Sequence, residues 1–387
     1  MTINNEHKKL NFSNEREQSQ ACLNSAEHEK NQGRNVLNVP NLRFPEFQGE
    51  WITYKIKDVL SIGNGRDYKH LSNGEIPVFG TGGYMTSVDK CLYDGETTFI
   101  GRKGSINKPF YYNGKFWTVD TLFYTHSFNG ITPKFTYCLF QTINWLKYNE
   151  ASGVPSLSKD TIEKIKIKIP GLEEQNKIAK LMFALDERIS TQNKIIEDLK
   201  KLKSAISKKL LCNDKWTACI IQDIAEIGRG RVISSVEIDR QKHPRYPVYS
   251  SQTSNNGIMG YLDNYMFDGE YITWTTDGAN AGTVFYRKGK FNCTNVCGTL
   301  KILPKFDCYF VSLVLQQATQ KYVSSNLANP KLMNNTMASI KIRMPNIETQ
   351  KQLSKVFQTL DSCLLVHQRT CKMYLSEKQY LLRQMFI

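Results

Sequence analysis

The chain has 387 residues, enough for two domains with buried cores, and a formal net charge of +15. Residues 1–50 carry six Lys or Arg against seven Glu, so the remaining residues carry 45 against 29 acidic side chains, a net charge of +16. A basic body favours a polyanionic partner, either nucleic acid or an anionic membrane surface. No apolar run approaches the roughly 18 residues of a membrane span, so we expect no transmembrane helix. The first residues lack an apolar segment, so we expect no secretory signal peptide.

The ten cysteines are irregularly spaced. Cys293 and Cys297 are close in sequence, but no second pair or histidine follows at a zinc-ligand spacing. We therefore expect reduced, partly buried thiols in a cytoplasmic protein without a metal site.

Residues 1–37 are rich in Asn, Gln, Glu, Ser and Lys. Such a segment buries too little apolar surface to offset the entropy of ordering, so the sequence predicts a flexible polar tail.

Residues 38–171 show the pattern of a first mixed α and β domain. Short strand-like runs are separated by Gly, Asn and Asp, and one of them ends before an apparent turn at Asn113-Gly114. Residues 135–148 are more helical in pattern. Lys164 to Ile169 alternate strictly in polarity and are followed by Pro170, so we expect a strand with one solvated face.

Residues 172–212 predict a long spacer helix, because apolar side chains recur mostly every three or four positions. At about 1.5 Å per residue such a helix is about 60 Å long. Residues 213–346 repeat the pattern of the first domain, and residues 347–387 repeat the helix. A single core-facing helix has the same stripe, but two at equivalent positions favour an antiparallel coiled coil. The expected pairing residues are Ile178, Leu181, Leu185, Leu199, Leu353, Val356, Leu360 and Leu364.

The second half of the chain is a repeat of the first. Trp51, Asp58 and Gly63–Arg66 recur 165 residues later as Trp216, Asp223 and Gly228–Arg231. From Gly114 and Gly289 onward the offset is 175, so the second copy has an insertion of ten residues (175 − 165) between Arg231 and Asp268. The period is too long for a solenoid, so we expect two whole α+β domains and a partner with two sites along its length.

Several segments resemble one known family. They are the lead-in Val39 to Phe47, the run Ile76–Gly80 with its counterpart Tyr246–Ser250, and the Pro-x-x-Glu-x-Gln pattern at Pro170–Gln175 and Pro345–Gln350. Through this ordered, duplicated set, residues 38–387 resemble the specificity subunits of type I restriction-modification enzymes.

The resemblance implies two target recognition domains, each reading one half of an asymmetric, interrupted sequence in double-stranded DNA, with the helix pair setting the gap. It implies two modification (methyltransferase) subunits and restriction subunits as partners. No cofactor is expected on this chain, since S-adenosylmethionine, ATP and Mg²⁺ belong to the adenine methyltransferase and ATP-dependent endonuclease of the partners. The chain itself is expected to be non-catalytic.

The DNA-binding chemistry is expected in loops, where side chains reach base edges and Lys or Arg contact phosphates. Arg102 and Lys103 are replaced by Thr276 and Asp277 in the second copy, which predicts different base preferences. The predicted residues of the first domain are Arg66, Lys69, Thr81, Arg102, Lys103, Ser105, Ser156 and Ser158. Those of the second are Arg229, Arg231, Ser250, Ser251, Gln252, Thr276, Asn280, Lys331 and Asn334.

Two alternatives remain open from the residues alone. A single-chain DNA-modifying enzyme needs a cofactor site, but the sequence contains neither a phosphate-binding Gly-x-x-x-x-Gly-Lys-Ser/Thr nor a Gly-x-Gly-x-x-Gly motif. A basic nucleic-acid-binding adaptor has the same charge and is distinguished by equal affinity for RNA and duplex DNA.

Overall fold

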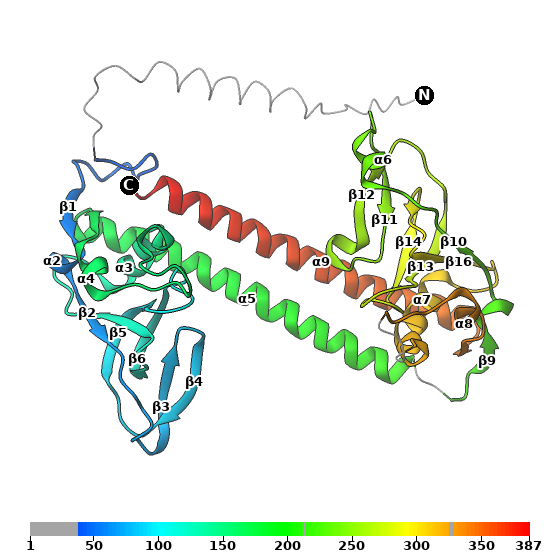
Figure 1. The fold of residues 1–387 in the computed structure, drawn as a ribbon, viewed down its shortest axis with the longest axis horizontal. Coiled ribbons are helices and arrows are strands. Elements are labelled where there is room, and N and C mark those ends of the chain that lie inside the picture. Colours follow the sequence, from blue (N-terminus) through cyan, green and yellow to red (C-terminus); the bar gives the residue numbers. More distant parts are fainter. Residues whose placement is uncertain (1–37, 212–213, 325–328) are drawn as a thin grey trace, which may run out of the picture. The chain divides into compact units, whose positions relative to one another are not determined.

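The structure is a computed structural model that describes residues 38–211, 214–324 and 329–387, so the predicted tail of residues 1–37 lies outside the described residues. The described residues form two compact units, one within Met1–Glu187 and Tyr374–Ile387, the other Arg188–Met373. Helix α5 (Leu172–Leu210) begins in the first unit and continues into the second, whereas α9 (Ile347–Gln384) begins in the second and ends in the first (Figure 1).

The first unit has a six-stranded sheet in the order β2-β7-β5-β6-β3-β4 and a separate pair of β1 with β8. Strands β3 and β6 are parallel, with Val78 opposite Trp117, and the other pairs are antiparallel. The elements are β1 (Ile52–Lys55), α2 (Ile56–Val59), β2 (Ser61–Asn64), β3 (Asn73–Gly80), β4 (Gly83–Val88), β5 (Tyr93–Gly101), β6 (Phe110–Thr118), β7 (Leu122–His126), α3 (Pro133–Phe140), η1 (Trp145–Tyr148), α4 (Lys159–Lys164) and β8 (Lys166–Ile169).

The turn predicted at Asn113-Gly114 is wrong. Strand β6 continues through both residues, and Gly114 pairs with Gly95 of β5. Both glycines have positive φ, 130° and 144°, so the strand is distorted there without reversing. Tertiary pairing with β5 overrides the local turn signal.

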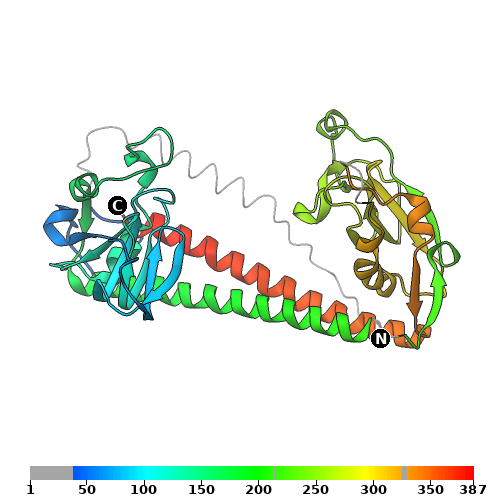
Figure 2. The same cartoon turned by 60° about the horizontal axis from the view of Figure 1, so that its bottom comes forward.

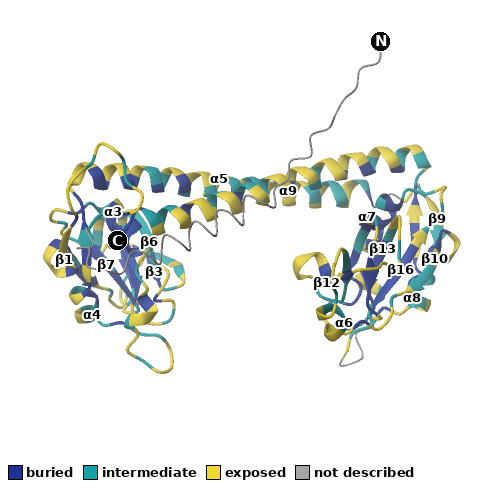
Figure 3. Cartoon of the chain, turned by 90° about the horizontal axis from the view of Figure 1, so that it is seen from above, coloured by how far each residue is buried: buried dark blue, intermediate teal, exposed yellow. Residues whose placement is uncertain are grey.

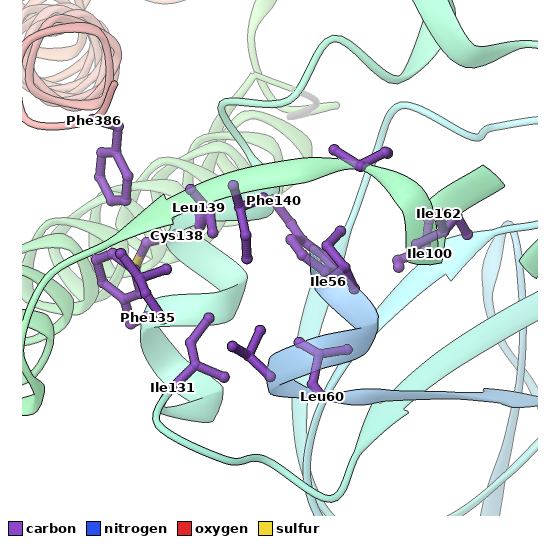
Figure 4. Packing of buried hydrophobic residues seen from close by; sticks show 14 of the residues in the cluster. Ile56, Leu60, Ile100, Ile131, Phe135, Cys138, Leu139, Phe140, Ile162 and Phe386 are labelled. Atoms are coloured by element: carbon purple, nitrogen blue, oxygen red, sulfur yellow. The ribbon is translucent and has the colours of Figure 1, made fainter. Parts of the chain in front are cut away.

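The core of the first unit combines residues from the two ends of the chain. Trp51 packs edge-on against Phe135 and Phe386, with ring centroids 6.1 and 6.2 Å apart. Phe135 and Phe386 stack at 5.4 Å (Figure 4). The segment Val39 to Phe47 also contacts the C-terminal end of α9, because the Leu42 N–H donates to the carbonyl of Gln384.

The second unit has the same strand order, divided into the sheets β10-β16-β13-β14 and β12-β11-β15 and the pair β17-β9. Its β14 and β15 together replace β6, since β15 is parallel to β11 as β6 is to β3. The elements are β9 (Thr217–Ile220), η2 (Ile221–Asp223), β10 (Ala225–Arg229), α6 (Ser235–Asp239), β11 (Tyr246–Tyr249), η3 (Ser254–Gly257), β12 (Ile258–Leu262), β13 (Glu270–Thr275), β14 (Val284–Lys288), β15 (Asn292–Cys293), β16 (Cys297–Ile302), α7 (Cys308–Ala318), η4 (Thr319–Tyr322), α8 (Asn334–Ala338) and β17 (Lys341–Met344).

Two elements account for the predicted insertion in the second copy. The offset between the copies rises from 165 at Arg231 to 170 at Tyr246, and the added residues form α6. It rises again after β11, where the added residues form η3. In sequence, α6 precedes and η3 follows β11, the strand that corresponds to β3.

The duplicated glutamine joins each long helix to its domain. Gln175 is fully buried, accepts from the N–H of Thr132, the N-cap of α3, and donates to the carbonyls of Gly130 and Pro170. Gln350 makes the equivalent bonds to Asp307, the N-cap of α7, and to Pro345. The duplicated Pro-x-x-Glu-x-Gln pattern therefore attaches each long helix to its domain by the same hydrogen bonds.

Within each unit the segments of α5 and α9 lie side by side and antiparallel (Figure 2). Figure 3 shows buried and half-buried residues along both helices. On each helix one stripe of such positions recurs at intervals of four and three, the heptad spacing of a left-handed coiled coil. On α5 they are Ile178, Met182, Leu185, Ile189, Gln192, Ile196, Leu199, Lys203, Ile206 and Leu210. On α9 they include Leu353, Phe357, Leu360, Leu364, His367, Cys371, Tyr374, Lys378 and Leu381.

Two of the predicted pairing residues are off this stripe. Val356 is 45% exposed, and the neighbouring Phe357 is fully buried in its place. Leu181 is half-buried against the core of the first unit. The predicted Ile178, Leu185, Leu199, Leu353, Leu360 and Leu364 do lie on the stripe.

Candidate nucleic-acid interface

One loop of the first unit, Thr118–Leu122 between β6 and β7, holds three of the predicted binding loops together. We call it the hub loop. Its backbone fixes the segments that carry Arg66, Thr81 and Arg102. The bonds are Arg66 N–H to Thr118 O (2.7 Å), Gly65 N–H to Leu122 O (3.2 Å), Val119 N–H to Phe79 O (3.0 Å) and Arg102 N–H to Thr121 O (2.8 Å).

The second unit repeats the hub loop at Cys293–Cys297. The same four bonds recur at equivalent positions, although most side chains differ. They are Arg231 N–H to Cys293 O (3.2 Å), Gly230 N–H to Cys297 O (3.1 Å), Thr294 N–H to Tyr249 O (2.9 Å) and Thr276 N–H to Val296 O (2.9 Å). Each unit thus presents one framework on which different loop side chains are mounted.

Gly65 and Gly230 are required by this framework, because a side chain at either position would collide with the neighbouring backbone. A Cβ on Gly65 would lie 1.8 Å from the carbonyl oxygen of Val119, and one on Gly230 would lie 2.2 Å from that of Cys293. Gly82, at the tip of the β3–β4 hairpin, has nothing within 4 Å of such a Cβ.

The structure brings most predicted residues of the first unit to the rim of this framework. Lys69 and Thr81 line an open hollow of about 820 Å³ together with Asp67 and Asp120. Thr81 also lies beside Gly101, at the start of the loop that carries Arg102, Lys103 and Ser105. Lys103 forms a β-bridge with Ser156.

Several predicted polar side chains are engaged within the protein. The Ser158 hydroxyl caps α4 and donates to Glu150. Asn280 donates to the Ser251 carbonyl, Gln252 to that of Ile258, and Asn334 to that of Gly228. These groups shape the loops, and their role toward DNA stays a prediction.

The three predicted cations of the second unit, Arg229, Arg231 and Lys331, are paired with carboxylates. Arg229 donates from Nη2 to Thr276 Oγ1 (2.9 Å) and Asp277 Oδ2 (3.2 Å), and from Nε to the Asn295 carbonyl (2.6 Å). Lys331 lies 3.9 Å from Asp277 Oδ1. Arg231 forms a two-pronged pair with Glu237 of α6, and the hydrogen bonds raise the pKa of Arg231 and lower the pKa of Glu237.

Strand β14 contains a buried cation, Arg287, that is not among the predicted site residues. Arg287 is 3% exposed, lies 3.5 Å from the Tyr249 ring centroid and 4.4 Å from that of Phe285, and donates to Thr273 Oγ1 at 3.1 Å. Burial lowers its pKa. Arg287 and Phe285 are two residues apart, so they lie on the same face of the strand, opposite to Val284 and Tyr286, which pack in the core of the second unit.

Residues 38–211, 214–324 and 329–387 contain no group of three His, Cys, Asp or Glu side chains arranged to hold a metal ion. No helix among them is long and apolar enough to cross a bilayer.

Comparisons with known proteins agree in one direction. The sequence model of the type I restriction modification DNA specificity domain matches residues 48–201 and 213–372. A candidate type I specificity subunit of Mycoplasma pneumoniae is 35% identical over 215 residues, which cover 54% of this chain and 80% of that protein. The specificity subunit of the MpnII restriction enzyme from the same organism is 43% identical over 137 residues, 35% of this chain and 41% of that protein.

Two solved structures share the fold. The crystal structure of a type I S subunit from M. genitalium superposes with a TM-score of 0.73 at 16% identity, covering 90% of this chain and 99% of that one. A chain from a study of complex assembly and conformational transition in a type I system gives a TM-score of 0.51 at 13% identity, covering 86% and 96%.

Proposed function

Because this chain belongs to the family of type I restriction-modification DNA specificity subunits, we propose that it reads an asymmetric, two-part DNA target and has no catalytic centre of its own. In this proposal residues 38–171 and 213–346 are the target recognition domains, and residues 172–212 and 347–387 are the spacer helices. The net charge of +16 outside residues 1–50 suits a DNA partner.

The observation that carries the proposal is the hub loop that occurs twice with different surrounding side chains. The same four backbone bonds hold the loops in each unit, so both present side chains in the same way. The first unit carries Lys103 where the second carries Asp277. Because the two domains share one backbone framework but differ in their loop side chains, we expect them to recognise two different half-sites.

The proposed partners are two modification subunits and the restriction subunits. S-adenosylmethionine, ATP and Mg²⁺ are assigned to those subunits. A fold shared with a chain studied in complex assembly of a type I system supports this assignment. A cytoplasmic location is part of the proposal, since the partner is DNA and the eight cysteines in the described residues are all free thiols.

The test is sequencing of methylated bases in cells that express this chain with a cognate modification subunit, compared with cells that lack only this chain. The expected result is a split, adenine-methylated motif that appears only with this chain. Absence of a motif, with the modification subunit shown to be active beside another specificity subunit, would overturn the proposal and favour the adaptor alternative.

A further inference from the structure

Lys103 and Asp277 occupy the same place in the two units. Each forms an antiparallel β-bridge, Lys103 with Ser156 and Asp277 with Lys331. Each precedes a glycine of positive φ, Gly104 at 82° and Gly278 at 94°. The flanking backbone bonds also match: Gly104 N–H to Pro155 O (2.8 Å) and Leu157 N–H to Arg102 O (2.9 Å) correspond to Gly278 N–H to Pro330 O (3.0 Å) and Leu332 N–H to Thr276 O (2.9 Å).

The side chain at this place is a hydrogen-bond donor in the first unit. Lys103 is exposed, and the residue across the bridge is the neutral Ser156. The ion pairs formed among the described residues do not include Lys103, unlike Arg229 and Lys331 of the second unit. An ammonium group only donates, so it needs an acceptor.

The side chain at this place is a fixed acceptor in the second unit. Oδ2 of Asp277 accepts from Thr276 Oγ1 at 2.5 Å and from Arg229 Nη2 at 3.2 Å. Among the described residues, Oδ1 has only the Lys331 ammonium at 3.9 Å, so it retains accepting capacity. The carboxylate is therefore held in one orientation, and its Oδ1 can accept a further hydrogen bond.

The two cations also make a carboxylate acceptable on a DNA-facing surface. An unpaired Asp would be repelled by the phosphates of the duplex. Arg229 and Lys331 offset that charge, and Arg229 is itself anchored to the Asn295 carbonyl of the hub loop. The corresponding positions in the first unit carry the neutral Asn64 and Ser156, as the donor Lys103 there requires no such compensation.

We propose that this shared position determines one base of each half-site, with opposite hydrogen-bonding roles in the two units. Lys103 takes a base that presents acceptors in the major groove, such as the O6 and N7 of guanine. Asp277 takes a base that presents an exocyclic amine there, as cytosine does with N4. The inference rests on the proposed function and adds to it the chemical class of base at one position of each half-site.

The test uses the full chain purified with its cognate modification subunits, after the wild-type motif is known. Methylation rates are measured on duplexes that carry each of the four base pairs at every position of both half-sites. Asp277→Asn, which adds donors at this place, is expected to reduce discrimination at one position of the second half-site by about 5- to 150-fold and to leave the first half-site unchanged. Lys103→Gln is expected to do the converse.

Matched controls lie at the far ends of the neighbouring strands. Asp268→Asn precedes β13 and Lys90→Gln precedes β5, both exposed and at the ends opposite to the hub loops, so neither should alter discrimination. Asp277→Glu keeps the acceptor and should keep the preference for an amine-bearing base, which covers the case in which Asp277→Asn does not fold.

Three outcomes decide the matter. A change of preference confined to one position of the expected half-site supports the inference. Rates that fall equally on all sequences would make Asp277 a structural clamp and overturn it, as would unchanged discrimination in both variants. If the wild-type chain itself gives no split motif, the proposed function fails, and this result is distinct from the other two.

Discussion

Nζ of Lys378 on α9 lies 2.5 Å from Oδ1 of Asp186 on α5 in the first unit, and the repeat supplies the same pair to the second unit with the helices exchanged. There Lys203 on α5 pairs with Asp361 on α9. The two lysines are 175 residues apart (378 − 203), and so are the two aspartates (361 − 186), which is the sequence offset between equivalent residues of the two copies. Each unit therefore contains a charged pair between α5 and α9 at one equivalent heptad place.

The first prediction concerns this pair. The side chains of Lys378 and Asp186 are 10% and 31% exposed. Lys378→Met therefore leaves a partly buried carboxylate without its cation. We expect the free energy of opening of the C-terminal part of α9 to fall by about 2 kcal/mol, less than for a fully buried pair because solvent screens Asp186. Native-state hydrogen exchange of the amides in Tyr374–Gln384 measures it.

The exposed pair of Glu197 and Lys201 is the control, and Glu197→Gln should leave exchange unchanged. The double variant Asp186→Leu with Lys378→Met should recover most of the loss, because both charges are then removed. An equal loss in the single and double variants would contradict the assignment.

The second prediction concerns the glutamines that attach the helices. Gln175→Leu leaves the Thr132 N–H without its acceptor, a loss of about 1–3 kcal/mol for a buried group. Faster amide exchange at Thr132 is expected, while exchange at Asp307 stays as in the wild type. Gln350→Leu should reverse the two results. If either variant accelerated both amides equally, the attachment would not be local to each domain.

The third prediction separates framework glycines from loop glycines. Gly65→Ala drives a methyl group into the Val119 carbonyl, so we expect a loss of about 1–3 kcal/mol and a disordered hub loop. Methylation directed by the first half-site should fall with it. Gly82→Ala, at the open hairpin tip, is the matched change and should alter neither stability nor the hub. Near-equal thermal midpoints for the two variants would refute the framework role.

The fourth prediction concerns the thiols. Burial raises the pKa of Cys297 from 9.0 to about 11 and that of Cys308 to about 12. A folded-state pKa above the unfolded one adds stability that is complete below pH 9 and is lost as the pH rises through the folded value. We therefore expect the free energy of unfolding to decline between about pH 9 and pH 12.

Alkylation provides an independent reading of the same burial. At neutral pH, iodoacetamide should modify the exposed Cys91 and Cys363 while sparing Cys297 and Cys308, as measured by mass spectrometry of the native protein. Rapid native-state modification of Cys297 would show that the second hub loop opens.

The sequence predicted the repeat, the helices and the helix-entry motif well, because Pro, Gly and Gln at those places make the same backbone contacts in both copies. It failed where two spacings were equally compatible with a helix. A step of three from Leu353 gives Val356, and a step of four gives Phe357, and only packing shows that Phe357 is inside.

The candidate interface was predictable in its loops but not in its pairings. Arg229 meets Asp277 across 48 residues, and Asn334 reaches the carbonyl of Gly228 across 106. Such contacts are fixed by the tertiary fold, so a list of polar loop residues cannot distinguish those free to bind a ligand from those engaged within the protein. Arg287 was missed for the same reason, since a cation in a strand is ordinarily solvated.

The place of Phe386 in the first core has a consequence for synthesis of the chain. The ribosome completes residues 51–182 long before residue 386, so the aromatic site that Trp51 and Phe135 form for Phe386 stays open to solvent until α9 arrives. A nascent chain that stalls inside α9 would expose that apolar site to chaperones and proteases. The core of the first unit is therefore completed only after α9 and Phe386 have been translated.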